Sequence, residues 1–140
     1  MMNIKPFWIL IARDGETVDG RYISAKALQE MADSYSLDYY TAYAYQDDYR
    51  GPRTMPIGLM LAAKTELQGK DTCLYVLFEP SEHWSIALSE FELKDIPVYP
   101  ALEYLPLMAN SAEPYITGMF LTTSPAIRNL DPLNKHMVKE

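Results

Sequence analysis

Cysteine, histidine and basic residues are all scarce in this chain of 140 residues. A single cysteine, Cys73, excludes a disulfide within the chain, and two histidines leave few ligands for a metal site. Lys and Arg number 12 against 19 Asp and Glu, which gives a formal net charge of −7. Because nonspecific binding to nucleic acid needs surplus positive charge to displace counterions, the composition disfavours nucleic acid as a direct partner.

Long hydrophobic runs are also missing. The longest apolar run, Phe7 to Ala12, is far shorter than the roughly 20 residues needed to cross a bilayer. The N-terminus lacks the charged, apolar and small-residue order of a signal peptide. We therefore expect no membrane partner and a cytoplasmic location. The 49% of hydrophobic residues instead indicates one compact domain with a buried core.

The pattern of apolar residues predicts an α+β fold, with a mostly antiparallel twisted sheet or small barrel and two short helices. Strands are expected over residues 7–12, 57–67, 72–79, 98–105 and 115–122. Residues 68–71 would form a four-residue hairpin loop. Ser24 and Ser81 are the expected N-caps of the two helices, the second ending near Phe91. Pro100 predicts an edge strand or a bulge.

The chain divides into an expected domain over residues 1–127 and a tail over residues 128–140. The tail has little periodicity, so we expect it to be a loosely attached extension. Cys73 lies within a strand-like apolar segment and is interpreted as a buried structural residue.

Motifs of known chemistry are absent from the sequence: it has no glycine-rich phosphate loop, no HExxH, no paired CxxC and no GxSxG. His83 and His136 have no cysteine or second histidine at ligand spacing. We therefore predict neither a metal nor a cofactor.

Tyrosine is concentrated between residues 35 and 49, which contain six of the eleven tyrosines interspersed with aspartates. Tyrosine supplies large amphipathic contact area at interfaces, which favours a binding surface. Equally, alternate tyrosines could pack against the sheet with their hydroxyls in water. The predicted binding residues are Tyr39, Tyr40, Tyr43, Tyr45, Asp47, Asp48 and Tyr49.

Several segments carry a family resemblance. They are Phe7–Ala12, Gly15–Thr17, Asp19–Ala25, Leu28–Ala32, Tyr49–Gly51, Ile57–Gly58, Val98–Glu103 and Gly118–Ala126. In these segments the chain resembles the phage capsid scaffolding protein family called GPO. The run from Asp19-Gly20-Arg21 to Gln29-Glu30-Met31-Ala32 is the most specific part.

In members of that family, a serine peptidase domain that uses an Asp, a His and a Ser is followed by a long helical scaffolding segment. We expect no room for that segment after Ala126 in this sequence. The aspartate position matches Asp19, but Asp48 stands at the histidine position and Ala101 at the serine position. A methyl group cannot attack a carbonyl, so Asp48 would have no hydroxyl to activate. The resemblance therefore implies an inactive peptidase homologue, in which Asp19 is a turn residue.

Three functions follow as hypotheses, with the oligomeric state left open. The first is a non-catalytic protein that binds a capsid or prohead component through the former substrate groove near Asp48 and residues 98–103. The alternative is an acidic inhibitor of a host nucleic-acid-targeting defence complex, of the anti-CRISPR kind. A residual hydrolase would need a rescue by Ser81, Ser85, Ser111 or Ser124. Each hypothesis places the protein in the cytoplasm of an infected or lysogenic bacterium.

Overall fold

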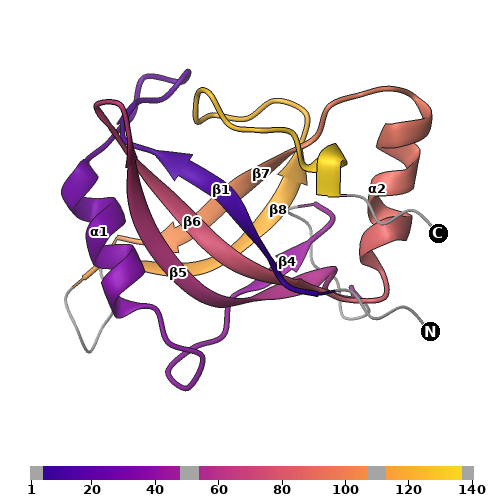
Figure 1. Ribbon diagram of the computed structural model, residues 1–140, viewed down its shortest axis with the longest axis horizontal. Helices are drawn as coiled ribbons and strands as arrows, with labels where there is room; N and C mark the ends of the chain where they lie inside the picture. The colour runs from indigo at the N-terminus through magenta and orange to yellow at the C-terminus, as the bar shows by residue number, and fades with distance from the viewer. Residues whose placement is uncertain (1–4, 48–53, 107–112, 137–140) are drawn as a thin grey trace.

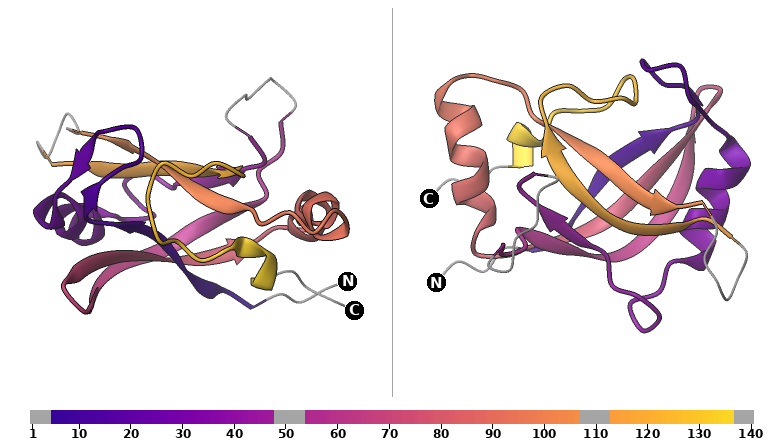
Figure 2. Two further views of the ribbon diagram at one scale, coloured as in Figure 1. Left: turned by 90° about the horizontal axis from the view of Figure 1, so that it is seen from above. Right: turned by 180° about the vertical axis from the view of Figure 1, so that it is seen from behind.

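A curled sheet of six strands dominates the computed structural model, which describes residues 5–47, 54–106 and 113–136 (Figure 1). In spatial order the strands are β1 (Phe7–Arg13), β6 (Asp71–Pro80), β5 (Gly58–Gln68), β4 (Tyr43–Tyr45), β8 (Tyr115–Thr122) and β7 (Tyr99–Leu105). The sheet bends into a half-barrel whose two end strands are β1 and β7 (Figures 1 and 2). The remaining elements are β2 (Gly15–Glu16), β3 (Tyr22–Ile23), α1 (Ala25–Ser34), α2 (Trp84–Leu93) and a 3-10 helix (Leu133–His136).

The predicted α+β class is confirmed. Every pairing in the six-stranded sheet is antiparallel except that of β4 with β8. Ser24 caps α1 as expected, since its Oγ accepts a hydrogen bond from the Ala27 N–H at 3.0 Å. Pro100 does lie in an end strand, where a missing backbone N–H costs no ladder hydrogen bond. Across the described residues, no helix has both the length and the apolar character to span a membrane.

Two local predictions are wrong. The loop between β5 and β6 contains only Gly69 and Lys70, because the strands continue to Gln68 and from Asp71. Gly69 adopts a φ of 62°, a conformation that a tight hairpin turn requires and that glycine tolerates.

Ser81 is not the N-cap of α2, since the helix begins at Trp84 with His83 at the cap position. The Ser81 hydroxyl instead donates to the Pro56 carbonyl oxygen at 2.9 Å and accepts from the His83 N–H at 3.1 Å. It therefore ties the turn before the helix to the start of β5.

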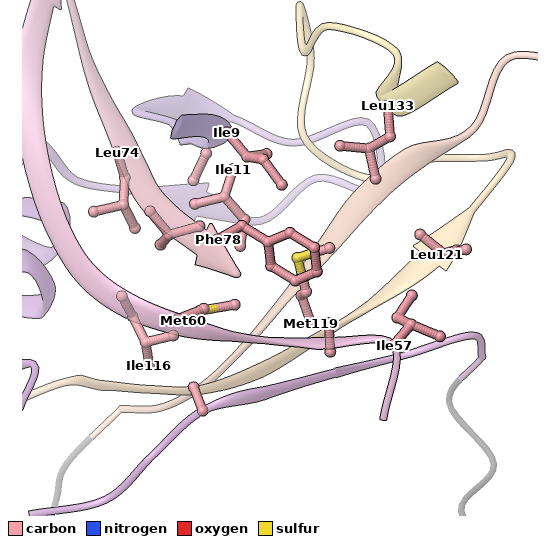
Figure 3. Packing of buried hydrophobic residues seen from close by; sticks show 14 of the residues in the cluster. Ile9, Ile11, Ile57, Met60, Leu74, Phe78, Ile116, Met119, Leu121 and Leu133 are labelled. Atoms are coloured by element: carbon pink, nitrogen blue, oxygen red, sulfur yellow. The ribbon is translucent and has the colours of Figure 1, made fainter. Parts of the chain in front are cut away.

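The core fills the concave side of the half-barrel (Figure 3). Phe78, Met60 and Met119 converge there from three strands and are fully buried. Helix α1 adds Leu28 and Met31, so one face of the helix closes one end of the core. Cys73 is also fully buried, and this burial raises the pKa of its thiol, as expected of a structural cysteine.

The tail is not loosely attached within its described part, residues 128–136. Leu130 and Leu133 are buried, and the Leu133 N–H donates to the Val98 carbonyl oxygen at 2.7 Å. The Asn134 side chain accepts from the Val98 N–H at 2.8 Å and donates to the Ile96 carbonyl oxygen at 2.9 Å. Single anchoring residues rather than a periodic face hold this segment, so periodicity could not reveal it.

We predict that Leu133→Ala lowers the free energy of unfolding by about 2–5 kcal/mol, because it leaves a cavity at a site that is 1% exposed. Urea unfolding of both proteins measures the loss. The matched control is Leu93→Ala, at a site that is 87% exposed, where a change within about 0.5 kcal/mol is expected. Equal, small effects at the two sites would contradict the anchored tail.

Candidate functional site

Ala101 lines a pocket of about 190 Å³ at the β7 end of the sheet. The pocket lies between β7 and the β2–β3 hairpin, whose turn contributes Arg21 and whose strand β3 contributes Ile23. Most of its lining is apolar, with Leu102, Phe120 and Ile127 among the contributors. The side chains with polar groups are Arg21, Tyr104, Thr122 and Ser124. The candidate site is therefore a small apolar pocket with one cationic side chain.

Aromatic side chains from neighbouring strands lie in register with Ala101. Ala101 pairs with Phe120 on β8, and Phe120 pairs with Tyr45 on β4. Directly paired residues share one face of a sheet, and residues two apart on a strand share a face as well. Tyr43 and Tyr45 therefore lie on the same face as Ala101, on the three strands seen together in the right-hand view of Figure 2. The structure thus brings two of the predicted binding tyrosines to the Ala101 face.

Asp19 is held by its own turn. The Thr17 hydroxyl donates to Asp19 Oδ1, and Arg21 Nε donates to Oδ2 at 2.9 Å. The hydrogen bond from Thr17, and to a lesser extent Arg21, lowers the pKa of the carboxyl. Gly20, with a φ of 86°, completes the turn. This geometry agrees with the predicted turn role of Asp19, whose contact with Arg21 steadies a side chain that lines the pocket.

The other predicted residues are spread over different places. Asp48 and Tyr49 lie outside the described residues, so the histidine position of the resemblance is not placed. Asp47 is exposed and lines a different hollow of about 360 Å³, together with Met55 and His83. Asp47 and Ala101 are thus not brought to one pocket.

Tyr39 and Tyr40 follow α1 and are 45% and 48% exposed. The rings of both contact the buried ring of Tyr115 edge-on, at centroid distances of 5.4 and 6.3 Å. The Tyr115 hydroxyl lies 2.7 Å from the Tyr40 carbonyl oxygen and accepts from the Ser36 N–H at 3.1 Å. Each ring is half packed and half exposed, so a binding role for these two tyrosines stays a prediction.

Sequence reasoning assigned no role to Tyr35. Its hydroxyl donates to the Met60 carbonyl oxygen at 2.6 Å and accepts from the Ala42 N–H at 2.9 Å. Burial raises the pKa of Tyr35 to about 12. This tyrosine fixes the segment that leads into β4, and only its position in a tyrosine-rich stretch could have drawn attention to it.

The serines named for a rescued hydrolase occupy unlike environments. Ser124 is exposed and lines the pocket with Ala101, whereas Ser81 is engaged near α2. Within the described residues, Ser85 Oγ is buried without a hydrogen-bond partner; Ser111 lies outside them.

Neither histidine lines the Ala101 pocket. His83 Nε2 lies 3.8 Å from Glu82 Oε1, and the His136 ring stacks on Phe7 at 4.3 Å. In the ranges that the structure describes, no three or more His, Cys, Asp or Glu side chains are grouped so as to hold a metal ion.

Comparison with known proteins identifies relatives of the chain. Residues 6–134 match the family described as the GPO serine peptidase, N-terminal domain. The chain is 30% identical over 129 residues to the capsid assembly scaffolding protein of Escherichia phage P2, an alignment that covers 83% of this chain and 43% of that protein. The chain thus spans less than half the length of this relative. No solved structure matches the chain.

We predict that the free energy of unfolding falls less steeply at acid pH in Asp19→Asn than in the wild type. The pKa of Asp19 is lower in the folded protein than its ordinary value of about 3.9, so its negative charge stabilises the fold at pH values above about 3.9. This contribution is lost as the pH falls through the pKa of the folded state. Urea unfolding at a series of pH values should show a steeper acid loss in the wild type than in the variant. Asp38→Asn, at an exposed carboxylate on another loop, is the control. Parallel curves for wild type and Asp19→Asn would contradict the turn role.

Proposed function

The chain belongs to the family of GPO serine peptidase N-terminal domains, and we propose that it takes part in phage capsid assembly as a binding protein without peptidase activity. The observation that carries this proposal is Ala101, which stands at the serine position of the resemblance and lines the pocket beside β7. A capsid or prohead component is the proposed partner, since the relative from Escherichia phage P2 is a capsid assembly scaffolding protein.

The absence of peptidase chemistry is supported by the contents of the pocket. Acyl transfer requires a nucleophile and a base that takes its proton. Ala101 offers only a methyl group, and the oxygens of Asp19 accept hydrogen bonds from Thr17 and Arg21. Ser124 supplies a hydroxyl, but no histidine shares this pocket with it. A volume of about 190 Å³ is compatible with a peptide side chain, and the described lining combines no nucleophile with a histidine base, which supports binding without cleavage.

A binding role is supported by the surface around the pocket. Tyr43 is 40% exposed, and it lies with Tyr45 and Phe120 on the face that carries Ala101. Exposed aromatic side chains on the same sheet face as a small apolar pocket are typical of protein-binding surfaces. A host defence complex as the partner rests on the net charge of −7 and on the mixture of aspartates and tyrosines between Asp33 and Asp48. Neither feature involves the Ala101 pocket, so the capsid role is the first proposal.

We predict that a fluorophosphonate probe does not label the wild-type protein, because the pocket pairs no hydroxyl with an imidazole base. Intact-protein mass spectrometry after incubation measures labelling, and a known serine hydrolase serves as the positive control. Labelling that disappears in Ser124→Ala would show that this serine is a nucleophile and would overturn the proposal of an inactive domain.

We predict that the tagged protein co-purifies with the major capsid protein encoded in the same phage or prophage genome. Ala101→Arg fills the pocket with a long charged side chain and should weaken binding by about tenfold or more. Leu67→Arg places the same side chain at a 74% exposed site on β5, next to the β5–β6 turn, and should leave binding unchanged.

Urea unfolding of both variants checks that each is folded. Recovery of a host nucleic-acid-handling complex in place of the capsid protein would instead support the defence-inhibitor hypothesis and contradict the capsid role.

A further inference from the structure

The end strand β7 has a paired strand on one side only, although the other end strand, β1, lies close to it. In the described sheet it pairs with β8 alone, and the sheet ends there. The backbone N–H and C=O groups of an end strand are unpaired on the outer side, which makes such an edge able to accept a further strand. Proteins protect these edges with prolines, irregular pairing or covering segments.

Two protections bracket a short stretch of β7. Directly before its first residue, Tyr99, the tail contacts Val98, whose N–H donates to Asn134 Oδ1 and whose C=O accepts from the Leu133 N–H. Towards its end the pairing with β8 shifts register between Glu103 and Tyr104. Between these two points, β7 runs alongside the pocket.

Backbone alternation identifies the groups on the outer side of β7. In an antiparallel strand the N–H and C=O of one residue point to the same side, and the direction reverses at each next residue. Val98 points its N–H and C=O away from β8, towards the tail, so Pro100 and Leu102 point theirs the same way. Pro100 has no N–H, which fits this outward direction. Leu102 therefore presents both a donor and an acceptor beside the pocket.

The pocket adds selectivity for a side chain. Its apolar contributors, Leu102, Phe120 and Ile127, suit an apolar side chain. Among the residues that the structure describes, Arg21 is the only charged one that lines this pocket, in a chain whose net charge is −7. Asp19 engages Arg21 through Nε, and a guanidinium carries further donors for a carboxylate.

We propose that the edge of β7 at Leu102 binds an extended peptide segment as an added strand, with an apolar side chain in the Ala101 pocket and a neighbouring carboxylate near Arg21. The inference rests on the proposed function in that it specifies how the Ala101 surface recognises a protein. In this mode the backbone hydrogen bonds supply affinity, and the pocket selects the side chain.

A display library of random short linear peptides, selected against the full chain, tests the proposal without any capsid protein. The enriched peptides should combine an apolar residue with a nearby acidic one. Fluorescence anisotropy should show a loss of about tenfold or more with Ala101→Arg and none with Leu67→Arg. Failure to enrich any peptide with this dependence on Ala101 overturns the proposal.

Two measurements on the wild-type protein test the strand geometry and do not depend on a variant that folds. Two versions of an enriched peptide are compared, N-methylated at the odd-numbered or at the even-numbered amides. One version should lose binding and the other should keep it, because only every second amide faces β7.

Hydrogen exchange followed by NMR should show new protection of the Leu102 N–H. The N–H groups of Ala101 and Glu103, which point toward β8, should change little. The proposal of an added strand is overturned if both methylated peptides lose binding equally, or if peptide binding leaves the Leu102 N–H unprotected.

These outcomes separate the inference from the proposed function. Peptide binding at Leu102 without co-purification of the capsid protein would leave the edge site standing and remove the capsid role. Co-purification that neither Ala101→Arg nor saturating enriched peptide disturbs would leave the capsid role standing and remove the edge site.

Discussion

The close contact between Phe78 and Gly58 is the constraint on which the rest of the fold depends. The Phe78 ring lies against the Gly58 backbone, where a Cβ would collide with the ring and stand 2.7 Å from the Glu79 carbonyl oxygen. Gly58 also pairs with both Ala44 and Pro80, so the contact lies where β4, β5 and β6 meet. A larger residue would push these strands apart and open the curl of the half-barrel.

From this contact, packing extends to the candidate site. The Phe78 ring packs on Trp84 at 4.7 Å, and Trp84 Nε1 donates to the His136 carbonyl oxygen at 3.1 Å. The tail thus anchored carries Leu133 to the start of β7. Core packing therefore determines how much of β7 is covered and how much stays open beside Ala101. A domain of this family that lacks the reacting groups would keep a surface whose shape its core maintains.

Local elements were predictable where neighbouring residues determine them. Ser24 caps α1 because its hydroxyl reaches an N–H three residues away, and Pro100 marks an edge through a missing donor in its own backbone. Ser81 failed as a cap because the Pro56 carbonyl, distant in sequence, engages its hydroxyl. The tail failed for the same kind of reason, since its partners at Val98 and Trp84 lie more than thirty residues earlier in the chain.

The sequence by itself determined the family resemblance, the fold class and which residues stand at the three positions that the resemblance matches to the family's triad, Asp19, Asp48 and Ala101. Only the tertiary structure decided that Arg21 and Ala101 line one pocket, that Tyr43 and Tyr45 share the Ala101 face, and that Asp47 lies at another hollow. The residue at each position is read directly from the sequence, and the spacing of apolar residues along the chain predicts local helices and strands. Strand order and register join segments far apart in the chain, so the composition of a pocket or a sheet face is settled only when the chain packs.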